Sequence, residues 1–155
     1  LMAEPFVVQT DLWPFVVSKL PSRIDEAELE RFMAIHDGLL ARHELYVTLT
    51  DCTGITEIPS ATVRKRIGDW NKRIEADIRR FNVATAIVLS NTLVRGALTA
   101  LHWLAPPPQP TELVARPYDG ARYLLTQLEK HDVRVTPAMQ RYVDSLASAG
   151  ATAVR

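Results

Sequence analysis

The chain has 155 residues, 47% of them hydrophobic, which suffices for one domain whose core needs neither a disulfide nor a metal. Its 18 basic side chains balance its 18 acidic ones, so it lacks the positive excess that is typical of nucleic-acid-binding proteins. The single cysteine, Cys52, excludes an internal disulfide, and no apolar run approaches the roughly 18 to 20 residues that span a bilayer. We therefore expect one cytoplasmic domain over residues 5–147, with no membrane span, no nucleic-acid partner and no cofactor.

Two segments rich in valine and aromatic residues open the domain, at residues 6–8 and 12–19. Thr10 and Asp11 separate them, and this arrangement predicts a β-hairpin. Pro14 lacks the backbone donor that a strand ladder uses, so we expect the second strand to lie at a sheet edge or to bend there.

Two amphipathic helices are predicted next, with a short strand at residues 45–50 between them. The first covers residues 24–42, starts at Ser22 or Asp25, and is expected to turn inward the side chains of Leu29, Met33, His36, Leu40 and His43. The second covers residues 60–81, and its helical period places on the inner face Val63, Ile67, Trp70, Ile74, Ile78 and Phe81.

A third helix is predicted over residues 92–104, after a strand at 83–89 that is apolar throughout and so is expected to be buried on both faces. Asn91 is a good cap for this helix. At about 100° per residue, one side gathers Leu93, Val94, Ala97, Leu101 and Leu104. We expect that side to face the sheet, and the solvent side to hold Arg95, Gly96, Thr99, His102 and Trp103.

The last third of the chain begins with a proline run at residues 106–110, which predicts a stiff extended connector. A strand at 111–116 and a helix at 118–131 follow. Thr136 and Pro137 predict the start of a final short helix that ends near Leu146. Residues 148–155 are mostly small, so we expect a flexible tail there.

Strands that alternate with helices indicate an α/β fold, with a mixed, mostly parallel five-stranded sheet, an antiparallel edge hairpin, packed helices and an appended C-terminal helix. Ligands in such folds bind at the carboxyl ends of the strands. Those ends are residues 51–54, 90–91 and 116–117.

Residues 51–63 read Asp-Cys-Thr-Gly-Ile-Thr-Glu-Ile-Pro-Ser-Ala-Thr-Val and resemble the signature of the STAS family, the anti-sigma factor antagonist fold. In that signature a strand ends in Asp, a loop turns, and Asp-Ser-Ser-Gly-Leu opens a helix. Asp51, Gly54 and Ile58 match, while Pro59 replaces Asp, Ser60 keeps the first Ser, Ala61 replaces the second Ser and Thr62 replaces Gly. The predicted topology resembles the divergent bacterial STAS/SEC14-like branch over roughly residues 5–131.

The resemblance implies a non-enzymatic regulatory module in bacterial signalling that binds a protein partner. In the family, a kinase phosphorylates the second Ser and abolishes binding. Ala61 has no hydroxyl, so a comparable switch here requires Ser60 or Thr62. A simpler interpretation is that Ser60 is an N-cap that contributes about 1 kcal/mol to the helix.

Catalytic and metal motifs receive little support from the sequence. Cys52 has no catalytic cysteine signature around it, and Asp51, Ser60 and His102 are suitable residue types without a recognisable arrangement. His36 and His43 are seven residues apart, which separates their backbones by roughly 10 Å on a helix, too far for one ion unless the side chains converge. We expect neither an enzyme nor a metal site.

The candidate ligand- or partner-binding residues are Asp51, Thr53, Ser60, Thr62, Ser90, Asn91, Arg95, Thr99 and Trp103. One hypothesis is a regulatory protein partner, and the alternative is a small-ligand sensor for a nucleotide, an anion or a lipid headgroup. Trp103 either anchors a two-fold homodimer or is covered by the C-terminal helix through Met139, Tyr142, Val143 and Leu146.

Overall fold

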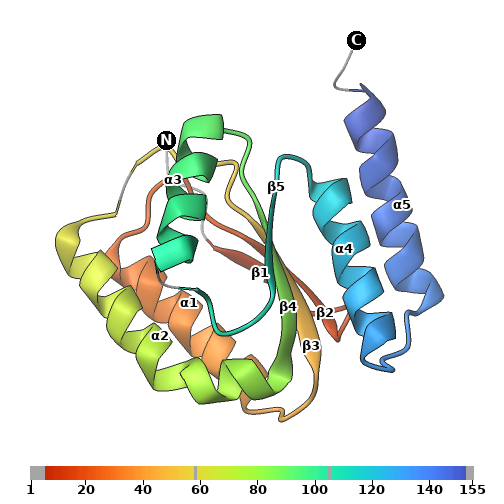
Figure 1. Ribbon diagram of the computed structural model, residues 1–155, viewed down its shortest axis with the longest axis horizontal. Helices are drawn as coiled ribbons and strands as arrows, with labels where there is room; N and C mark the ends of the chain where they lie inside the picture. The colour runs from red at the N-terminus through yellow and green to blue at the C-terminus, as the bar shows by residue number, and fades with distance from the viewer. Residues whose placement is uncertain (1–5, 58, 105, 153–155) are drawn as a thin grey trace.

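The computed structural model describes residues 6–57, 59–104 and 106–152 (Figure 1), and the side chains at 97, 101, 103, 104 and 150–152 lie outside that description. The elements follow one another as β1 (Val7–Gln9), β2 (Phe15–Lys19), α1 (Glu26–Leu40), β3 (Tyr46–Asp51), α2 (Ala61–Phe81), β4 (Asn82–Val88), α3 (Thr92–Leu104), β5 (Thr111–Val114), α4 (Pro117–Lys130) and α5 (Pro137–Thr152). This order is the predicted one.

The strands form one sheet in the order β1-β2-β3-β4-β5, in which β1 runs antiparallel to β2 and the other neighbours are parallel. The predicted mixed sheet with an edge hairpin is therefore confirmed. The predicted second strand was too long, because residues 11–14 form a turn and β2 starts at Phe15. The missing donor of Pro14 thus falls outside the ladder, and β2 lies inside the sheet rather than at its edge.

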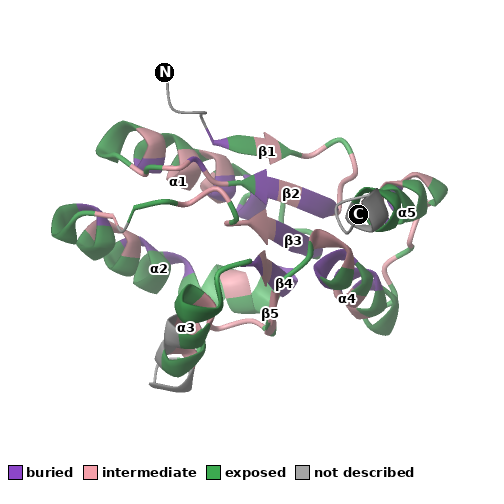
Figure 2. Ribbon diagram, turned by 90° about the horizontal axis from the view of Figure 1, so that it is seen from above, coloured by how far each residue is buried: buried purple, intermediate pink, exposed green. Residues whose placement is uncertain are grey.

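The helices cover the sheet on both faces. Figures 1 and 2 show α1, α2 and α3 on one face and α4 and α5 on the other. Buried residues are concentrated in the three central strands, β2, β3 and β4. No helix within the described residues combines the length and the apolar character that a membrane crossing requires.

The layer of α4 and α5 packs an apolar face against the sheet. From the helices it buries Ala121, Leu124, Leu128, Met139 and Val143, and from the sheet Phe15, Val47, Leu49, Ala84, Ala86 and Val88. Gly120 allows α4 to approach closely, because a Cβ there would lie 3.0 Å from Leu49 Cδ1 and 3.1 Å from the side chains of Ala86 and Val114.

In the layer of α1 and α2, the buried residues of α2 are those that its helical period predicted. Val63, Trp70, Ile74 and Phe81 are buried, as expected, and Ile67 and Ile78 are half-buried. In α1 the buried residues are Leu29, His36, Leu39 and Leu40, so Leu39 was missed. His43 was wrongly placed on this helix, which ends at Leu40. It has a left-handed φ of 54° and stacks on Phe81 with ring centroids 5.1 Å apart.

The orientation of α3 is the main correction to the predicted fold. Leu93 and Val94 were expected to face the sheet, but their side chains are 83% and 49% exposed. Arg95, Leu98 and His102 are half-buried instead. Figure 2 shows α3 at the margin of its layer, where little of the sheet is left to cover, so the apolar first turn meets solvent.

The C-terminal helix also differs from its prediction. α5 continues to Thr152, beyond the expected end near Leu146, so the predicted tail is helical over residues 148–152. It packs beside α4, with Met139 and Val143 fully buried, on the face of the sheet opposite to α3 (Figure 1). The alternative in which α5 covers Trp103 is therefore wrong, and the side chain of Trp103 itself lies outside the described residues.

Candidate functional site

The carboxyl ends of β2, β3 and β4 converge at one edge of the sheet, and backbone hydrogen bonds hold the segments that leave them. Leu20 N donates to Asp51 O at 3.0 Å, Cys52 N donates to Val88 O at 3.0 Å, and Leu89 N donates to Val114 O at 2.9 Å. This edge is where the sequence predicted the site.

Asp51 closes a tight turn at the end of β3. Its Oδ1 accepts hydrogen bonds from Thr53 N at 2.9 Å and Thr53 Oγ1 at 2.6 Å. Strand alternation turns Asp51 to the same side as Val47 and Leu49, the side of α4 and α5. There burial, with smaller contributions from Asp51 and Asp11, raises the pKa of the Tyr142 hydroxyl. Asp51 and Ser60 therefore lie on different faces of the sheet, although the sequence signature groups them.

Ser60 is the N-cap of α2, as predicted, because its Oγ accepts a hydrogen bond from Val63 N at 3.2 Å. Ser60, Ala61 and Thr62 are all exposed. Arg64 Nη1 donates to Pro59 O at 3.3 Å, which places a guanidinium beside the start of the helix. Both candidate hydroxyls are accessible to another protein. Ile58, the third matching position of the signature, lies outside the described residues.

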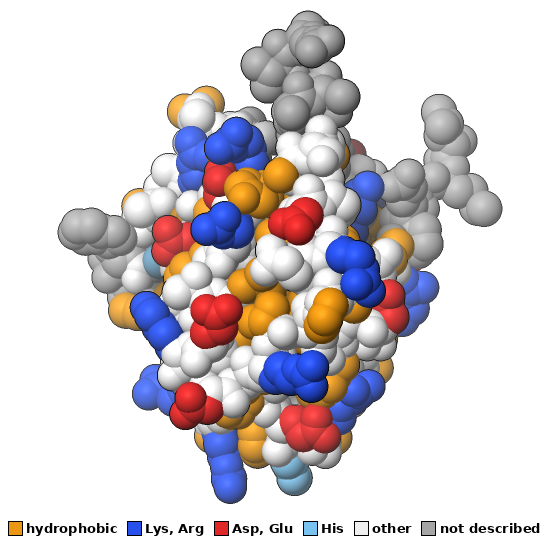
Figure 3. Space-filling view, turned by 90° about the vertical axis from the view of Figure 1, so that its right-hand side faces the viewer, with side chains coloured by type: hydrophobic (Ala, Val, Ile, Leu, Met, Phe, Trp, Pro, Cys, Tyr) orange, Lys and Arg blue, Asp and Glu red, His pale blue; other side chains and the backbone are white. Residues whose placement is uncertain are grey.

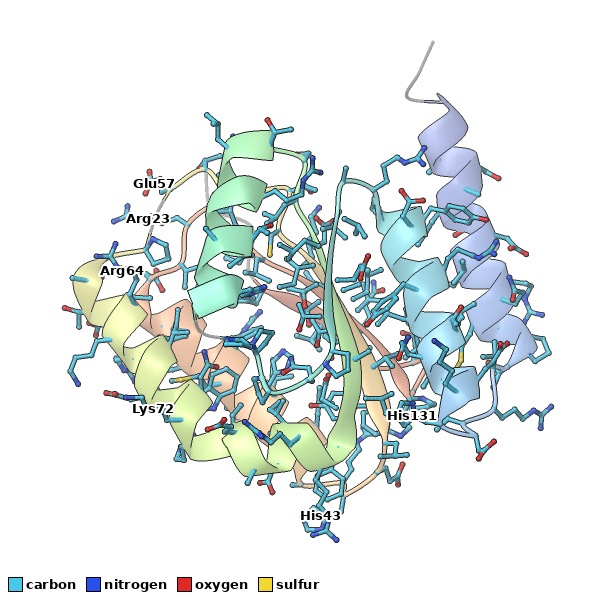
Figure 4. The ribbon with its side chains drawn as sticks, viewed as in Figure 1. Arg23, His43, Glu57, Arg64, Lys72 and His131 are labelled. Carbon is cyan, nitrogen blue, oxygen red and sulfur yellow. The ribbon has the colours of Figure 1, made fainter. Side chains whose placement is uncertain are left out.

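The loop before α2 docks on the loop before α1, and the two border a half-open cavity. Thr56 donates to Ser22 O through its backbone N at 3.1 Å and through its hydroxyl at 3.3 Å, and Arg23 pairs with Glu57 at 3.6 Å. The cavity measures about 310 Å³ and is lined by Arg23, Ile24, Asp25, Glu26, Glu57, Pro59, Ser60 and Val63. Figure 4 shows Arg23, Glu57 and Arg64 at this corner of the molecule, remote from His43 and His131.

A smaller hollow of about 80 Å³ lies at the start of α3 and is lined by Cys52, Thr53, Ile55, Leu89, Ser90, Asn91 and Val94. It brings together three predicted residues, Thr53, Ser90 and Asn91. Burial and the neighbouring Asp51 carboxylate raise the pKa of the Cys52 thiol to about 12, so the thiolate is scarce at neutral pH. Cys52 is consequently a poor nucleophile.

The polar side chains Asn91, Arg95 and Thr99 bond to α3 or to the segment that leads into it. Asn91 Oδ1 accepts from Leu93 N at 2.9 Å and from Val94 N at 3.2 Å, which confirms the predicted cap. Arg95 Nη1 donates to Leu89 O at 3.5 Å, and Thr99 Oγ1 donates to Arg95 O at 2.8 Å. Arg95 and Thr99 thus stabilise the helix and its entry, and neither reaches the cavity beside Ser60.

The predicted residues therefore fall into separate groups around the edge of the sheet. Thr53, Ser90 and Asn91 share the small hollow, while Ser60 lies at the larger cavity. The sequence missed Arg23, Asp25 and Glu26, because only the docking of the two loops brings them to Ser60. It also missed the exposed pair Leu93 and Val94, because apolar periodicity was taken to mean burial.

Side chains that could bind a metal are scattered in the part of the chain that the structure describes. No group of three or more His, Cys, Asp or Glu side chains is arranged there to hold a metal ion. His36 is buried between α1 and α2, whereas His43 is exposed beyond the end of α1, so the two do not share a helix face.

No known family model and no curated protein matches the sequence. Among solved structures, the chain is similar to an uncharacterized protein of the DUF3478 family from Shewanella loihica PV-4, described as having a SpoIIAA-like fold. The TM-score is 0.58 at 13% sequence identity, and the match covers 80% of this chain and 96% of that one. The STAS-type fold expected from residues 51–63 is therefore confirmed, and this chain has the SpoIIAA-like architecture.

Proposed function

We propose that this chain is a non-enzymatic regulatory module of bacterial signalling that binds a protein partner at its carboxyl-edge surface. We define that surface as Ile55, Leu93 and Val94 at the small hollow, together with Ser60 at the larger cavity. The observation that carries the proposal is the exposure of Leu93 and Val94, at 83% and 49%, in the first turn of α3. Large apolar side chains that gather beside a hollow at an exposed edge are typical of interaction sites.

The state of the nucleophile-type side chains supports binding rather than catalysis. The Cys52 thiol is held protonated by burial, and the Ser60 hydroxyl is engaged as a helix cap. The half-buried His102 has a lowered pKa, because burial disfavours its charged form, but it lies in α3 and does not line the cavity at Ser60. These groups form no nucleophile and base pair.

Regulation would act through Ser60 or Thr62, since Ala61 cannot be phosphorylated. A phosphate at the start of α2 would meet free backbone N–H groups, the positive end of the helix dipole and the nearby Arg64. It would also add negative charge at the larger cavity, on the Ser60 part of the carboxyl-edge surface. Phosphopeptide mapping of the protein from its native cells tests this step, and phosphate on neither residue would indicate a constitutive binder.

The binding test uses a photo-crosslinking amino acid at position 93 in native cells, followed by titration of the purified partner by calorimetry. Leu93→Glu should weaken binding at least tenfold, because it places a charge in an apolar contact. Leu45→Glu is the matched control, since Leu45 is 38% exposed but precedes β3 at the amino end of the sheet. Equal binding by wild type and Leu93→Glu would contradict the proposal.

The face of α4 and α5 makes a weaker candidate for the partner. Figure 3 shows acidic, basic and hydrophobic side chains intermixed on that side, so that neither a positive nor a negative patch forms there. A homodimer through Trp103 remains a separate prediction. Trp103→Glu should then yield a folded monomer in sedimentation, whereas a wild type that is already monomeric would contradict the homodimer.

A small-ligand sensor is the second candidate function, and the cavity of about 310 Å³ beside Ser60 favours it. That volume lies at the lower end of the range for small-molecule sites, and the starts of α1 and α2 both border it. Native mass spectrometry of protein from its own cells tests the idea. A bound molecule that Ile24→Phe displaces would favour the sensor over the partner-binding module.

A further inference from the structure

The buried polar side chains of this molecule are distributed unevenly between the two faces of the sheet. Within the described residues, three buried side-chain atoms have no hydrogen-bond partner: Ser18 Oγ, His36 Nε2 and Gln109 Oε1. Ser18 alternates with Phe15 and Val17, which face α4 and α5, so it points to the other face. Gln109 bonds Thr85, which alternates with Ala84 and Ala86 in the same way. All three atoms therefore lie in the layer of α1, α2 and α3.

His36 lies at the centre of the contact between α1 and α2. Its ring centroid is 4.2 Å from that of Phe32 and 6.2 Å from that of Trp70, and the residue is 9% exposed. Next to it, Asp37 accepts hydrogen bonds from Trp70 Nε1 at 3.0 Å and from Arg73 at 3.1 Å. The two helices are thus joined by aromatic contacts around an imidazole and by one carboxylate.

The charged groups around His36 are few and mostly paired with one another. On α1 the nearest is Asp37, which is neutralised by Arg73 of α2, and the outer side of the contact carries the pair Glu30 and Arg66. The strands present Ser18, Thr48 and Tyr46 to this layer, and burial raises the pKa of the Tyr46 hydroxyl, so all three are neutral below pH 7.5. A protonated His36 would therefore be surrounded by aromatic rings. The carboxylate beside it, Asp37, already bonds to Trp70 and Arg73.

Burial lowers the pKa of His36 to about 4, and the Asp37 carboxylate opposes this shift in part. A released α1 would expose the ring and restore its ordinary pKa of 6.5. Between these two values the released form binds the proton and the packed form does not, so the packed form is most stable above pH 6.5 and loses stability as the pH falls toward 4.

We infer that α1 and α2 form an acid-labile layer, which protonation of His36 releases from the sheet while α4 and α5 stay packed. The opposite layer has an apolar core in which Leu124, Leu128, Met139 and Val143 are fully buried, and its described residues include no buried histidine. Asp25 and Glu26 at the start of α1 line the cavity beside Ser60. Release of α1 would therefore take this cavity apart.

The test is hydrogen exchange of the whole chain at pH 7.5 and 5.5, followed by mass spectrometry and expressed as protection factors that remove the pH dependence of the intrinsic rate. Carboxylates with ordinary pKa values stay ionised over this range. The opening equilibrium of α1 and α2 should rise roughly tenfold, as two pKa values of 6.5 and about 4 require. Amides of α4 and α5 should keep their protection.

Two variants keep the result interpretable if one of them folds poorly. His36→Gln and His36→Phe should both abolish the pH dependence in α1 and α2, because neither side chain titrates. His102→Gln, in the margin helix α3, should retain it. A uniform loss of protection over both layers, a wild type without pH dependence, or His36 variants that keep the dependence would each overturn the inference.

Discussion

The two faces of the sheet are built in different ways. On the side of α4 and α5, apolar side chains interlock and Gly120 lets the helix approach to within van der Waals distance of the strands. On the other side, a buried polar chain crosses the sheet: Asn82 Nδ2 donates to Thr48, Thr85 donates to Asn82 Oδ1, and Gln109 donates to Thr85. The layer of α4 and α5 stabilises the fold, whereas the layer of α1, α2 and α3 carries the proposed site and the titratable His36.

This difference follows from the cost of polar burial. An apolar layer gains free energy with every side chain removed from water, while a polar layer gains little net and loses when a donor or acceptor remains unsatisfied. Ser18, His36 and Gln109 each retain such an atom. We therefore expect the layer of α1, α2 and α3 to open more readily than the layer of α4 and α5.

The largest expected effect comes from Trp70→Ala, which removes the main aromatic of the polar layer together with its hydrogen bond to Asp37. We expect a loss of about 3 to 5 kcal/mol in the free energy of unfolding, as for other truncated buried aromatics. Urea denaturation measures it. An unchanged midpoint would contradict the assigned phase of α2 and the importance of this layer.

A smaller effect is expected from Gly120→Ala in the apolar layer. The added Cβ would meet Leu49, Ala86 and Val114 at 3.0 to 3.1 Å, so the helix must shift, at a cost of about 1 to 3 kcal/mol. Gly68→Ala in α2 is the matched control, because a Cβ there has no atom within 4 Å and should stabilise the helix by about 0.5 to 1 kcal/mol. Thermal unfolding that shifts both variants in the same direction would contradict the close approach of α4.

The smallest effect should come from Thr48→Val, which removes the hydroxyl that accepts a hydrogen bond from the buried Asn82 amide. We expect a loss of about 1 to 2 kcal/mol, most of it the cost of an unsatisfied donor. Thr50→Val, two residues along the same face of β3 and half-buried, should cost less. Equal effects in chemical denaturation would show that the polar chain adds nothing specific to this face.

Local signals predicted much of the fold. Ser60 and Asn91 are helix caps as expected, because a side-chain oxygen that meets the first free N–H groups acts over three residues and needs no distant partner. The period of α2 predicted its buried face because the apolar residues of a long helix repeat over several turns and mark one side of it consistently. The candidate site was predicted less well, since the loops of Arg23 and Glu57 meet only in the folded chain.

By itself the sequence determined the order of the elements and the caps of its helices, since each rests on interactions between residues close in the chain, and the alternation of strands with helices implied the mixed sheet. Only the tertiary structure decided that Leu93 and Val94 face solvent, that α5 packs beside α4, and that His36 is enclosed with no partner for its Nε2. Periodicity shows which side chains share a face of a helix. What that face meets depends on neighbours that are distant in sequence, and α3 at the margin of its layer meets little of the sheet.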